Sequence, residues 1–215
     1  MKGTYPKNKA AIIALASLAW FGVLLQLFVT LHSTLESGRS VWGGLVGFFG
    51  YFTILTNLLV CISLTAPLLA PASATGGFFA RSDVTAGVAT SIVFVSLAYH
   101  FLLRNVWNPQ GLQLLADVLL HYAMPVLFLA YWWFNFPKGA LRWTHPLLWG
   151  LYPTLYLVYV LIRGRLIGTY PYGFIDPQAI GYERMMINAL GLLGVFIVLG
   201  LVLIALGRLQ RRAGA

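Results

Sequence analysis

The chain has 215 residues, of which 60% are hydrophobic and only 9% are charged. Because soluble proteins carry roughly 25% charged residues, this composition excludes an ordinary soluble domain and indicates an integral membrane protein. The formal net charge of +9 would suit a nucleic-acid-binding protein, but the 14 lysines and arginines are spread between apolar stretches. That spread is typical of membrane topology and of contact with anionic membrane lipids, and we expect no nucleic-acid partner.

Six stretches approach the length of about 20 mostly apolar residues that a helix needs to cross a bilayer. They predict an all-α, polytopic membrane protein, a six-transmembrane-helix bundle that forms a single integral membrane domain over residues 1–215. The predicted spans are 9–31, 42–69, 84–103, 111–134, 147–162 and 185–206.

The positive charges predict the orientation of these spans. Nine of the lysines and arginines fall on one side of the membrane and five on the other. Because positive charge gathers in cytoplasmic loops, both termini are predicted to be cytoplasmic. The nine are Lys2, Lys7, Lys9, Arg81, Lys138, Arg142, Arg208, Arg211 and Arg212, and the five are Arg39, Arg104, Arg163, Arg165 and Arg184.

The second span carries a polar face. In its segment GYFTILTNLLVC, residues 50–61, the side chains of Thr53, Thr56 and Asn57 fall within an arc of about 100° on a helix. A single intramembrane threonine usually hydrogen-bonds its own helix or a neighbouring one, so each threonine alone is interpreted as structural. An asparagine is costlier to bury, and Asn57 is expected to have a partner on another helix.

The fourth span contains two ionisable residues, Asp117 and His121. An acid at bilayer depth costs on the order of 2.5–3.5 kcal/mol on insertion scales, so such residues usually face the bundle interior and mark a functional site. Their spacing of four residues places them on one helix face. Pro125 has no N–H for the carbonyl of His121, so we expect the helix to be bent or opened there.

The topology places polar residues of different helices at comparable depth. Thr53 and His121 each lie about ten residues below the outer end of their spans, and they are expected at similar height. A polar cavity open toward the outer leaflet is therefore predicted. Further polar residues of the outer halves are Gln26, His32, Tyr99, His100, Asp117 and Asn188.

A hydroxyl beside an imidazole can act as a nucleophile. A neutral His121 within hydrogen-bond reach could take the proton of Thr53 as its oxygen attacks a carbonyl. Asp117 could orient the imidazole ring, and Asn57, Tyr99 or a freed backbone N–H could stabilise an oxyanion. The same residues also fit the simpler interpretation of side chains that hydrogen-bond neighbouring helices together.

Three segments carry a resemblance to a known family. YFTILTN in the second span, AYHFLLRNVWNPQGLQLLADVLLHYAMP from the third span into the fourth, and TYPYGFIDP before the sixth resemble the androgen-induced protein family, also called the androgen-dependent TFPI-regulating protein family. The resemblance covers most of the chain and is greater to the bacterial six-helix relatives than to the animal members. It implies a location in a bacterial cell membrane.

This resemblance implies a function. The animal members are multipass threonine hydrolases that cleave fatty acid esters of hydroxy fatty acids with an intramembrane threonine and histidine. The histidine corresponds to His121, and the threonine to Thr53. The sequence departs from the animal pattern in two places, because an extra residue separates Thr53 from Asn57, where those proteins carry an acid, and Asp117 replaces an amide. Thr56 therefore stays a candidate nucleophile.

The leading hypothesis is a lipid ester hydrolase whose substrate enters from the bilayer, without cofactor or metal. Arg104, or Arg163 with Arg165, could meet a free carboxylate of the substrate, although helix-end arginines often reach to headgroups instead.

Two other classes remain open. The protein could be non-catalytic, or Asp117 and His121 could relay protons in a transporter, although no internal repeat is visible. Haem ligation by two histidines at matching depth is the third reading, for which His100 and His121 are offset along their spans. The four histidines are His32, His100, His121 and His145.

Overall fold

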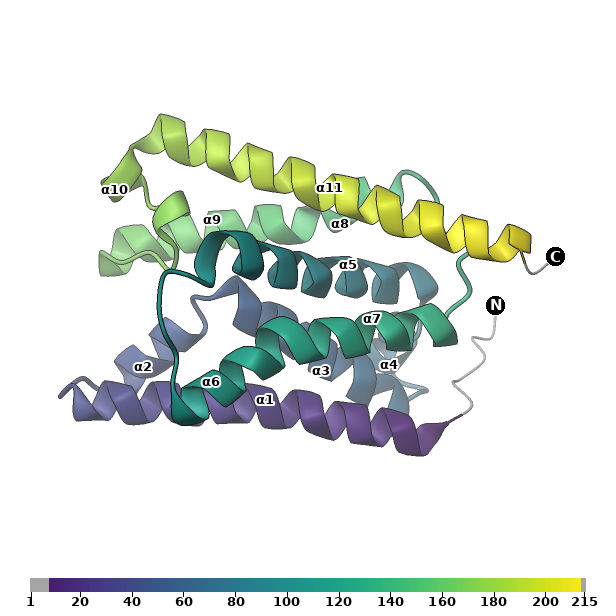
Figure 1. The fold of residues 1–215 in the computed structure, drawn as a ribbon, viewed down its shortest axis with the longest axis horizontal. Helices are drawn as coiled ribbons and strands as arrows, with labels where there is room; N and C mark the ends of the chain where they lie inside the picture. The colour runs from purple at the N-terminus through teal and green to yellow at the C-terminus, as the bar shows by residue number, and fades with distance from the viewer. Residues whose placement is uncertain (1–7, 214–215) are drawn as a thin grey trace.

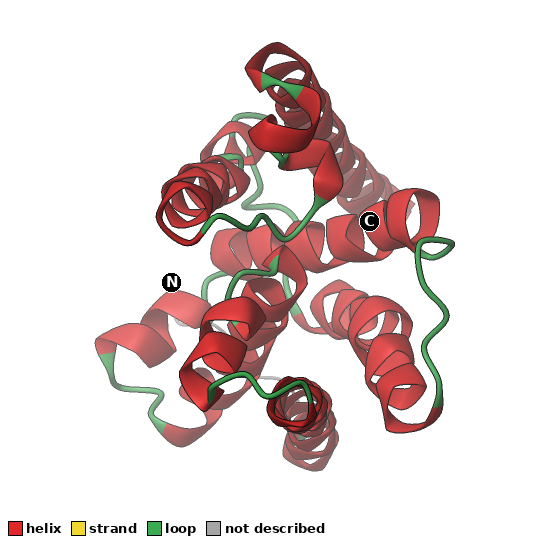
Figure 2. Ribbon diagram, turned by 90° about the vertical axis from the view of Figure 1, so that its left-hand side faces the viewer, coloured by secondary structure: helices red, strands yellow, loops and turns green. Residues whose placement is uncertain are grey.

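The computed structural model describes residues 8–213. Lys2 and Lys7, two of the nine charges assigned to the cytoplasmic side, lie outside the described residues. Within the described range the chain forms helices and connecting loops, with no strand (Figures 1 and 2). The all-α bundle predicted from the sequence is confirmed.

Within residues 8–213, six helical segments are long and apolar enough to cross a membrane, so the chain has the make-up of a multi-pass membrane protein. Five of them cover their predicted ranges and extend up to five residues beyond them, because hydropathy alone does not detect the polar turns at helix ends; the second segment is shorter than predicted. The segments are Lys9–Glu36, Phe52–Leu69, Ser82–Leu103, Gly111–Asn135, His145–Ile167 and Tyr182–Leu209.

The prediction of one continuous helix over 42–69 is wrong. The chain forms a short helix α2 (Val41–Phe48), breaks at 49–51, and continues as α3 (Phe52–Leu69). In Figure 1 the two helices follow one another at an angle above α1 (Lys9–Glu36). The break creates two helix ends inside the bundle, whose free backbone groups need partners because lipid supplies none.

Side chains of the fifth span supply partners for the end of α2. The Tyr156 hydroxyl donates to the Gly50 carbonyl at 2.9 Å, and the Tyr159 hydroxyl donates to the Phe49 carbonyl at 3.2 Å. The guanidinium of Arg163 donates twice to the Val46 carbonyl, at 3.0 and 3.2 Å. A larger residue than Gly50 would require the Arg163 side chain to shift, because a Cβ at that position would lie 2.9 Å from Cζ of Arg163.

The third and fourth spans each contain one widened turn with π-helical hydrogen bonding. In the third span, α5 (Ser82–Ala98) continues into a π-helical segment, Tyr99–Leu103. In the fourth span, a π-helical segment at Leu119–Ala123 lies between α6 (Gly111–Val118) and α7 (Met124–Asn135). The opening expected near His121 is thus present, in a π-helical turn directly before Pro125.

The remaining helices complete the two ends of the bundle. A short helix α4 (Ala74–Phe79) joins α3 to α5. The fifth span consists of α8 (His145–Trp149) and α9 (Leu151–Ile167), and the loop after it contains a 3₁₀ turn (Gly173–Ile175) and α10 (Pro177–Ile180) before α11 (Tyr182–Ala213). Helix α1 begins and α11 ends at the same end of the bundle, on the right in Figure 1.

Candidate functional site

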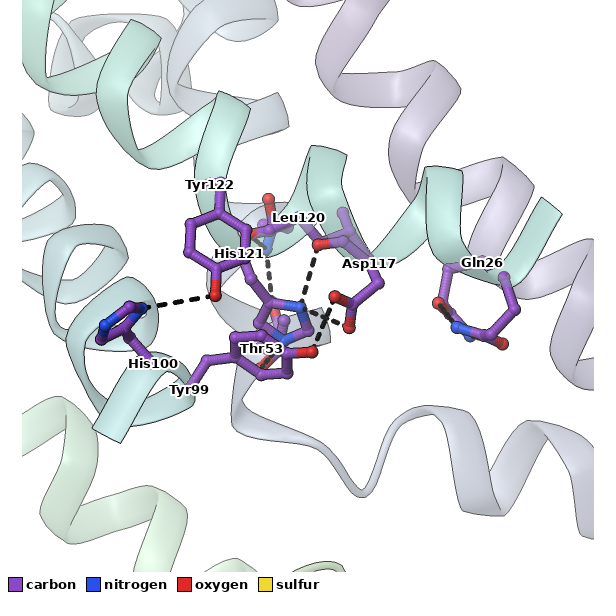
Figure 3. Close-up of polar contacts among 10 residues, drawn as sticks. Gln26, Thr53, Tyr99, His100, Asp117, Leu120, His121 and Tyr122 are labelled. Carbon is purple, nitrogen blue, oxygen red and sulfur yellow. Dashed lines mark hydrogen bonds and ion pairs between the residues drawn. The ribbon is translucent and has the colours of Figure 1, made fainter. Parts of the chain in front are cut away.

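Asp117 and His121 contact each other on the fourth span, as their spacing predicts. The imidazole Nδ1 of His121 lies 3.1 Å from the backbone carbonyl oxygen of Asp117 and 3.2 Å from its carboxylate Oδ1 (Figure 3). The carbonyl contact has hydrogen-bond geometry, whereas Oδ1 is a buried oxygen without a hydrogen bond. Because a carbonyl only accepts, Nδ1 carries the hydrogen in neutral His121, and Nε2 is left as an acceptor.

Thr53 meets the acceptor side of this ring. Its Oγ1 lies 3.3 Å from Nε2 of His121, so the hydroxyl can donate to the imidazole. Thr53 is the second residue of α3, and the broken second span places this helix end at the height of His121. The two residues that the sequence placed at similar depth are therefore in contact, and Thr53, His121 and Asp117 form a continuous chain of polar contacts.

Thr56 occupies a different environment. Its side chain is fully buried and its Oγ1 lies 3.0 Å from the hydroxyl of Tyr152 on α9. It lines neither of the two cavities that reach Thr53. The placement of the two threonines favours Thr53 as the candidate nucleophile.

Tyr99 supports both members of the Asp117–His121 pair. Its hydroxyl donates to Oδ2 of Asp117 at 2.7 Å, and its ring stacks on the imidazole of His121 with centroids 3.8 Å apart. The stacking leaves the imidazole little freedom to rotate, which preorganises it toward Thr53. Because its hydroxyl hydrogen is directed at Asp117, Tyr99 is a positioning residue here and not the oxyanion donor considered from the sequence.

His100 and Arg104 lie at the edge of this cluster. His100 Nε2 lies 3.1 Å from the Arg104 guanidinium, and His100 Nδ1 lies 3.5 Å from the hydroxyl of Tyr122. Figure 3 shows His100 on the far side of Tyr122, away from Thr53. Neither His100 nor Arg104 lines the cavities that reach Thr53.

Asn57 explains how the π-helical turn is tolerated. In that turn the Met124 N–H donates to the carbonyl of Leu119, five residues earlier, so it leaves the carbonyl of Leu120 without its usual α-helical partner. The next N–H in the π-helical register belongs to residue 125, a proline, and is missing. Asn57 Nδ2 fills the gap by donating to Leu120 O at 3.3 Å and to Thr53 O at 2.9 Å.

This arrangement corrects two expectations from the sequence. The sequence predicted that the carbonyl of His121 loses its partner at Pro125. The carbonyl that accepts from Asn57 instead belongs to Leu120, because the π-helical turn shifts the hydrogen-bond register by one residue. Both amide hydrogens of Asn57 are also occupied by backbone carbonyls, so Asn57 ties the Thr53 helix to the His121 helix and has no hydrogen left for an oxyanion.

Tyr172, in the loop before the sixth span, was not predicted as a site residue. Its hydroxyl oxygen accepts a hydrogen bond from the Phe52 N–H at 3.1 Å, at the N-terminus of α3, and it also interacts with Thr53. Burial raises the pKa of Tyr172 to about 12, so the phenol keeps its hydrogen at neutral pH. The motif TYPYGFIDP contained this residue, but alternating tyrosines in a loop are also typical of interfacial anchors.

Asn188, predicted as a supporting residue, holds this loop in place. Its Nδ2 donates to the carbonyl of Phe174 at 2.9 Å, and Phe174 in turn stacks on Tyr172. Asn188 lines neither cavity that reaches Thr53. It supports Thr53 through the Tyr172 loop, without a place in the cavity walls.

Two cavities of different character meet at Thr53. One has a volume of about 330 Å³ and an almost wholly apolar wall, which includes Phe52, Phe94 and Leu193. The other has a volume of about 410 Å³ and a more polar wall, which includes His121 and Gln26. The residues common to both walls are Thr53, Tyr99, Leu103 and Tyr172.

The polar cavity lies at the end of the bundle that the topology prediction assigns to the outer side of the membrane. Its wall includes residues from the second half of α1, from α6, from the loop after the third span and from the loop before the sixth span. These elements gather at the end of the bundle opposite to the end where α1 begins, on the left in Figure 1. A molecule with one apolar and one polar portion could place the bond between them beside Thr53.

The arginines considered as carboxylate ligands have other positions. Arg163 donates to the backbone carbonyls of Val46 and Thr169, so its guanidinium holds the end of α2.

Among the described residues no group of three or more histidine, cysteine or acidic side chains could hold a metal ion. No protein-family model, curated protein or solved structure matches this chain.

Proposed function

We propose that this protein is an intramembrane threonine hydrolase that cleaves lipid esters, with Thr53 as the nucleophile and His121 as the general base. One observation carries the proposal: Thr53 Oγ1 lies 3.3 Å from an imidazole nitrogen that is left as an acceptor, at the junction of an apolar and a polar cavity. A nucleophile, a base and a group that orients the base are the parts that acyl transfer requires.

The first half-reaction forms an acyl-enzyme. As Oγ1 of Thr53 attacks the ester carbonyl carbon, its proton passes to Nε2 of His121. The tetrahedral intermediate collapses when the bond to the alcohol oxygen breaks and Nε2 returns the proton to that oxygen. The alcohol leaves, and the fatty acyl group remains on Thr53.

The second half-reaction restores the enzyme. A water molecule from the polar cavity gives a proton to His121 Nε2 and attacks the acyl carbon. The bond to Oγ1 breaks, Thr53 regains its proton from the imidazolium, and a fatty acid is released. Asp117 Oδ1, 3.2 Å from Nδ1, stabilises the positive charge that the ring carries during both steps.

Tyr172 is the best-placed donor for the oxyanion. Its oxygen accepts a hydrogen bond from the Phe52 N–H and it also interacts with Thr53, so its own hydrogen can turn toward an oxyanion that forms beside Thr53, where the two cavities meet. A donor held at a helix N-terminus is favourable beside a developing negative charge. Tyr99 and Asn57 cannot take this role, since their hydrogens are bonded to Asp117, Thr53 and Leu120.

The proposal extends to family and setting. The resemblance to the androgen-induced protein family agrees with the contact between the two residues that correspond to its threonine and histidine. We accordingly propose fatty acid esters of hydroxy fatty acids as substrates, a bacterial cell membrane as the location, and cytoplasmic termini.

The test uses purified protein in lipid nanodiscs and a panel of simple and branched fatty acid esters. Thr53→Ala and His121→Ala are expected to abolish turnover, whereas Thr53→Ser retains part of it and Thr56→Val, the matched control, retains it fully. A fluorophosphonate probe should add its mass to the peptide that contains Thr53.

Three outcomes would contradict the proposal. Full activity in Thr53→Ala would show that Thr53 is not the nucleophile. Absence of turnover with every ester would show that the protein is not an ester hydrolase. Proton-coupled flux in liposomes that is lost in Asp117→Asn but kept in Thr53→Ala would identify a transporter instead.

A further inference from the structure

The polar cavity contains one charged residue with no partner. Of the side chains that line it, Arg39 is the one that belongs to a lysine, arginine, aspartate or glutamate. Among the described residues, no hydrogen bond or ion pair involves its guanidinium. The nearest acid along the chain, Glu36, forms an exposed pair with His32 at 3.2 Å and does not line the cavity.

The backbone of Arg39 is fixed, although its side chain is exposed. Helix α1 ends at Glu36, and Gly38 turns the chain with a φ of 70°, a conformation that glycine adopts without strain. The Arg39 N–H then donates to the carbonyl of Thr34 at 3.0 Å, which closes the helix end. This turn holds Arg39, an exposed residue, in the wall of the cavity that reaches Thr53.

The rest of the polar wall consists of neutral groups. Gln26 and Gln113 hydrogen-bond each other at 2.8 and 3.3 Å, and Gln26 also donates to Thr30. No aspartate or glutamate side chain lines this cavity. A cavity wall with one free guanidinium and no carboxylate favours an anionic occupant.

We propose that Arg39 forms the subsite that binds an anionic group on the alcohol portion of the ester. This inference rests on the proposed hydrolase function. The apolar cavity takes the acyl chain, because its wall is almost wholly apolar. The alcohol portion must then occupy the polar cavity, where Arg39 would hold a carboxylate or a phosphate through charge-assisted hydrogen bonds.

The experiment compares three esters with the same acyl chain. Their alcohol portions carry a free carboxylate, the methyl ester of that carboxylate, or a phosphate. Each is given to wild-type protein, to Arg39→Gln, and to Arg165→Gln as the matched control. Arg165 is an exposed arginine that lines neither cavity.

Arg39→Gln is expected to lower kcat/KM for the carboxylate ester by about 10- to 150-fold, mainly through KM, as the loss of a hydrogen bond to a charged group implies. Turnover of the neutral methyl ester should not change, nor should any value for Arg165→Gln. A loss confined to the phosphate ester also supports the subsite and identifies phosphate as its ligand. Equal effects of Arg39→Gln on charged and neutral esters, or no effect, would overturn the inference.

A binding measurement separates this inference from the proposed function. The dissociation constant of a hydroxy fatty acid is measured for wild type and Arg39→Gln without any turnover. If no ester is cleaved but wild type binds the acid at least about tenfold more tightly, the subsite stands and the hydrolase proposal fails. If esters are cleaved, but the dissociation constant and kcat/KM are the same in wild type and Arg39→Gln, the hydrolase proposal stands and the subsite is wrong.

Discussion

Replacing Asp117 by asparagine tests how the imidazole of His121 is held. In many hydrolases a carboxylate fixes the tautomer of the catalytic histidine, and its replacement by an amide lowers kcat by about 10⁴-fold. Here the hydrogen on Nδ1 is directed at the backbone carbonyl of Asp117, at 3.1 Å, and this carbonyl is unchanged in Asp117→Asn. The substitution therefore removes the negative charge at 3.2 Å and keeps the tautomer.

The expected loss follows from that difference. A hydrogen bond or close contact to a charged group contributes about 1.5–3 kcal/mol, and each 1.36 kcal/mol in the barrier changes the rate tenfold. Asp117→Asn should therefore lower kcat by about 10- to 150-fold. The amide oxygen can still accept the hydrogen bond from Tyr99, which now holds Oδ2 at 2.7 Å, so the protein should fold normally.

The assay is the rate of acyl-enzyme formation in a single turnover, with thermal unfolding and gel filtration as controls for folding. A loss near 10⁴-fold would mean that the carboxylate, and not the backbone carbonyl, sets the tautomer. An unchanged rate would mean that the ring carries no positive charge in the rate-limiting step. Either result would contradict the roles assigned here to the backbone carbonyl and the carboxylate of Asp117.

Three further substitutions test separate parts of the site. Tyr172→Phe should lower kcat by about 10²- to 10³-fold, because an oxyanion donor is lost. Since the pKa of the Tyr172 phenol is about 12, the pH–rate profile of the variant should have the wild-type shape below about pH 10. A changed shape would mean that Tyr172 titrates during the reaction. Asn57→Leu should lower the free energy of unfolding by about 1–3 kcal/mol, measured by denaturant titration, because the Leu120 carbonyl loses its partner; no loss would show that this carbonyl finds another donor. Gly50→Ala should lower the melting temperature, because its Cβ would lie 2.9 Å from Arg163; an unchanged value would mean that the arginine moves without cost.

The sequence was sufficient for features that depend on local spacing. The interval of four residues between Asp117 and His121 predicted their contact, and Pro125 predicted the opened turn. Counting residues from the outer ends of two spans placed Thr53 and His121 at one height. Membrane topology converts sequence position into depth, so this part of the site could be inferred without coordinates.

Features that depend on contacts between distant segments could not be inferred. The break at 49–51 lies in an aromatic and apolar segment without a helix-breaking residue other than glycine, and the donors that stabilise it lie on α9, more than 100 positions later in the chain. Tyr172 reaches Phe52 from 120 positions away along the chain. The distinction between Thr53 and Thr56 also needed coordinates, because both lie on the same polar arc of the helix.

The interrupted second span has a consequence for biogenesis. The N–H of Phe52 at the start of α3 donates to Tyr172, and carbonyls at the end of α2 accept from side chains of α9. None of these hydrogen bonds can form until the later part of the chain has been synthesised. Until then, an unbroken helix or a hydrated kink is the only way to satisfy the backbone of the second span in the membrane. Thr53, at the start of α3, thus reaches its final position only after the fifth span and the Tyr172 loop have been made and packed against it.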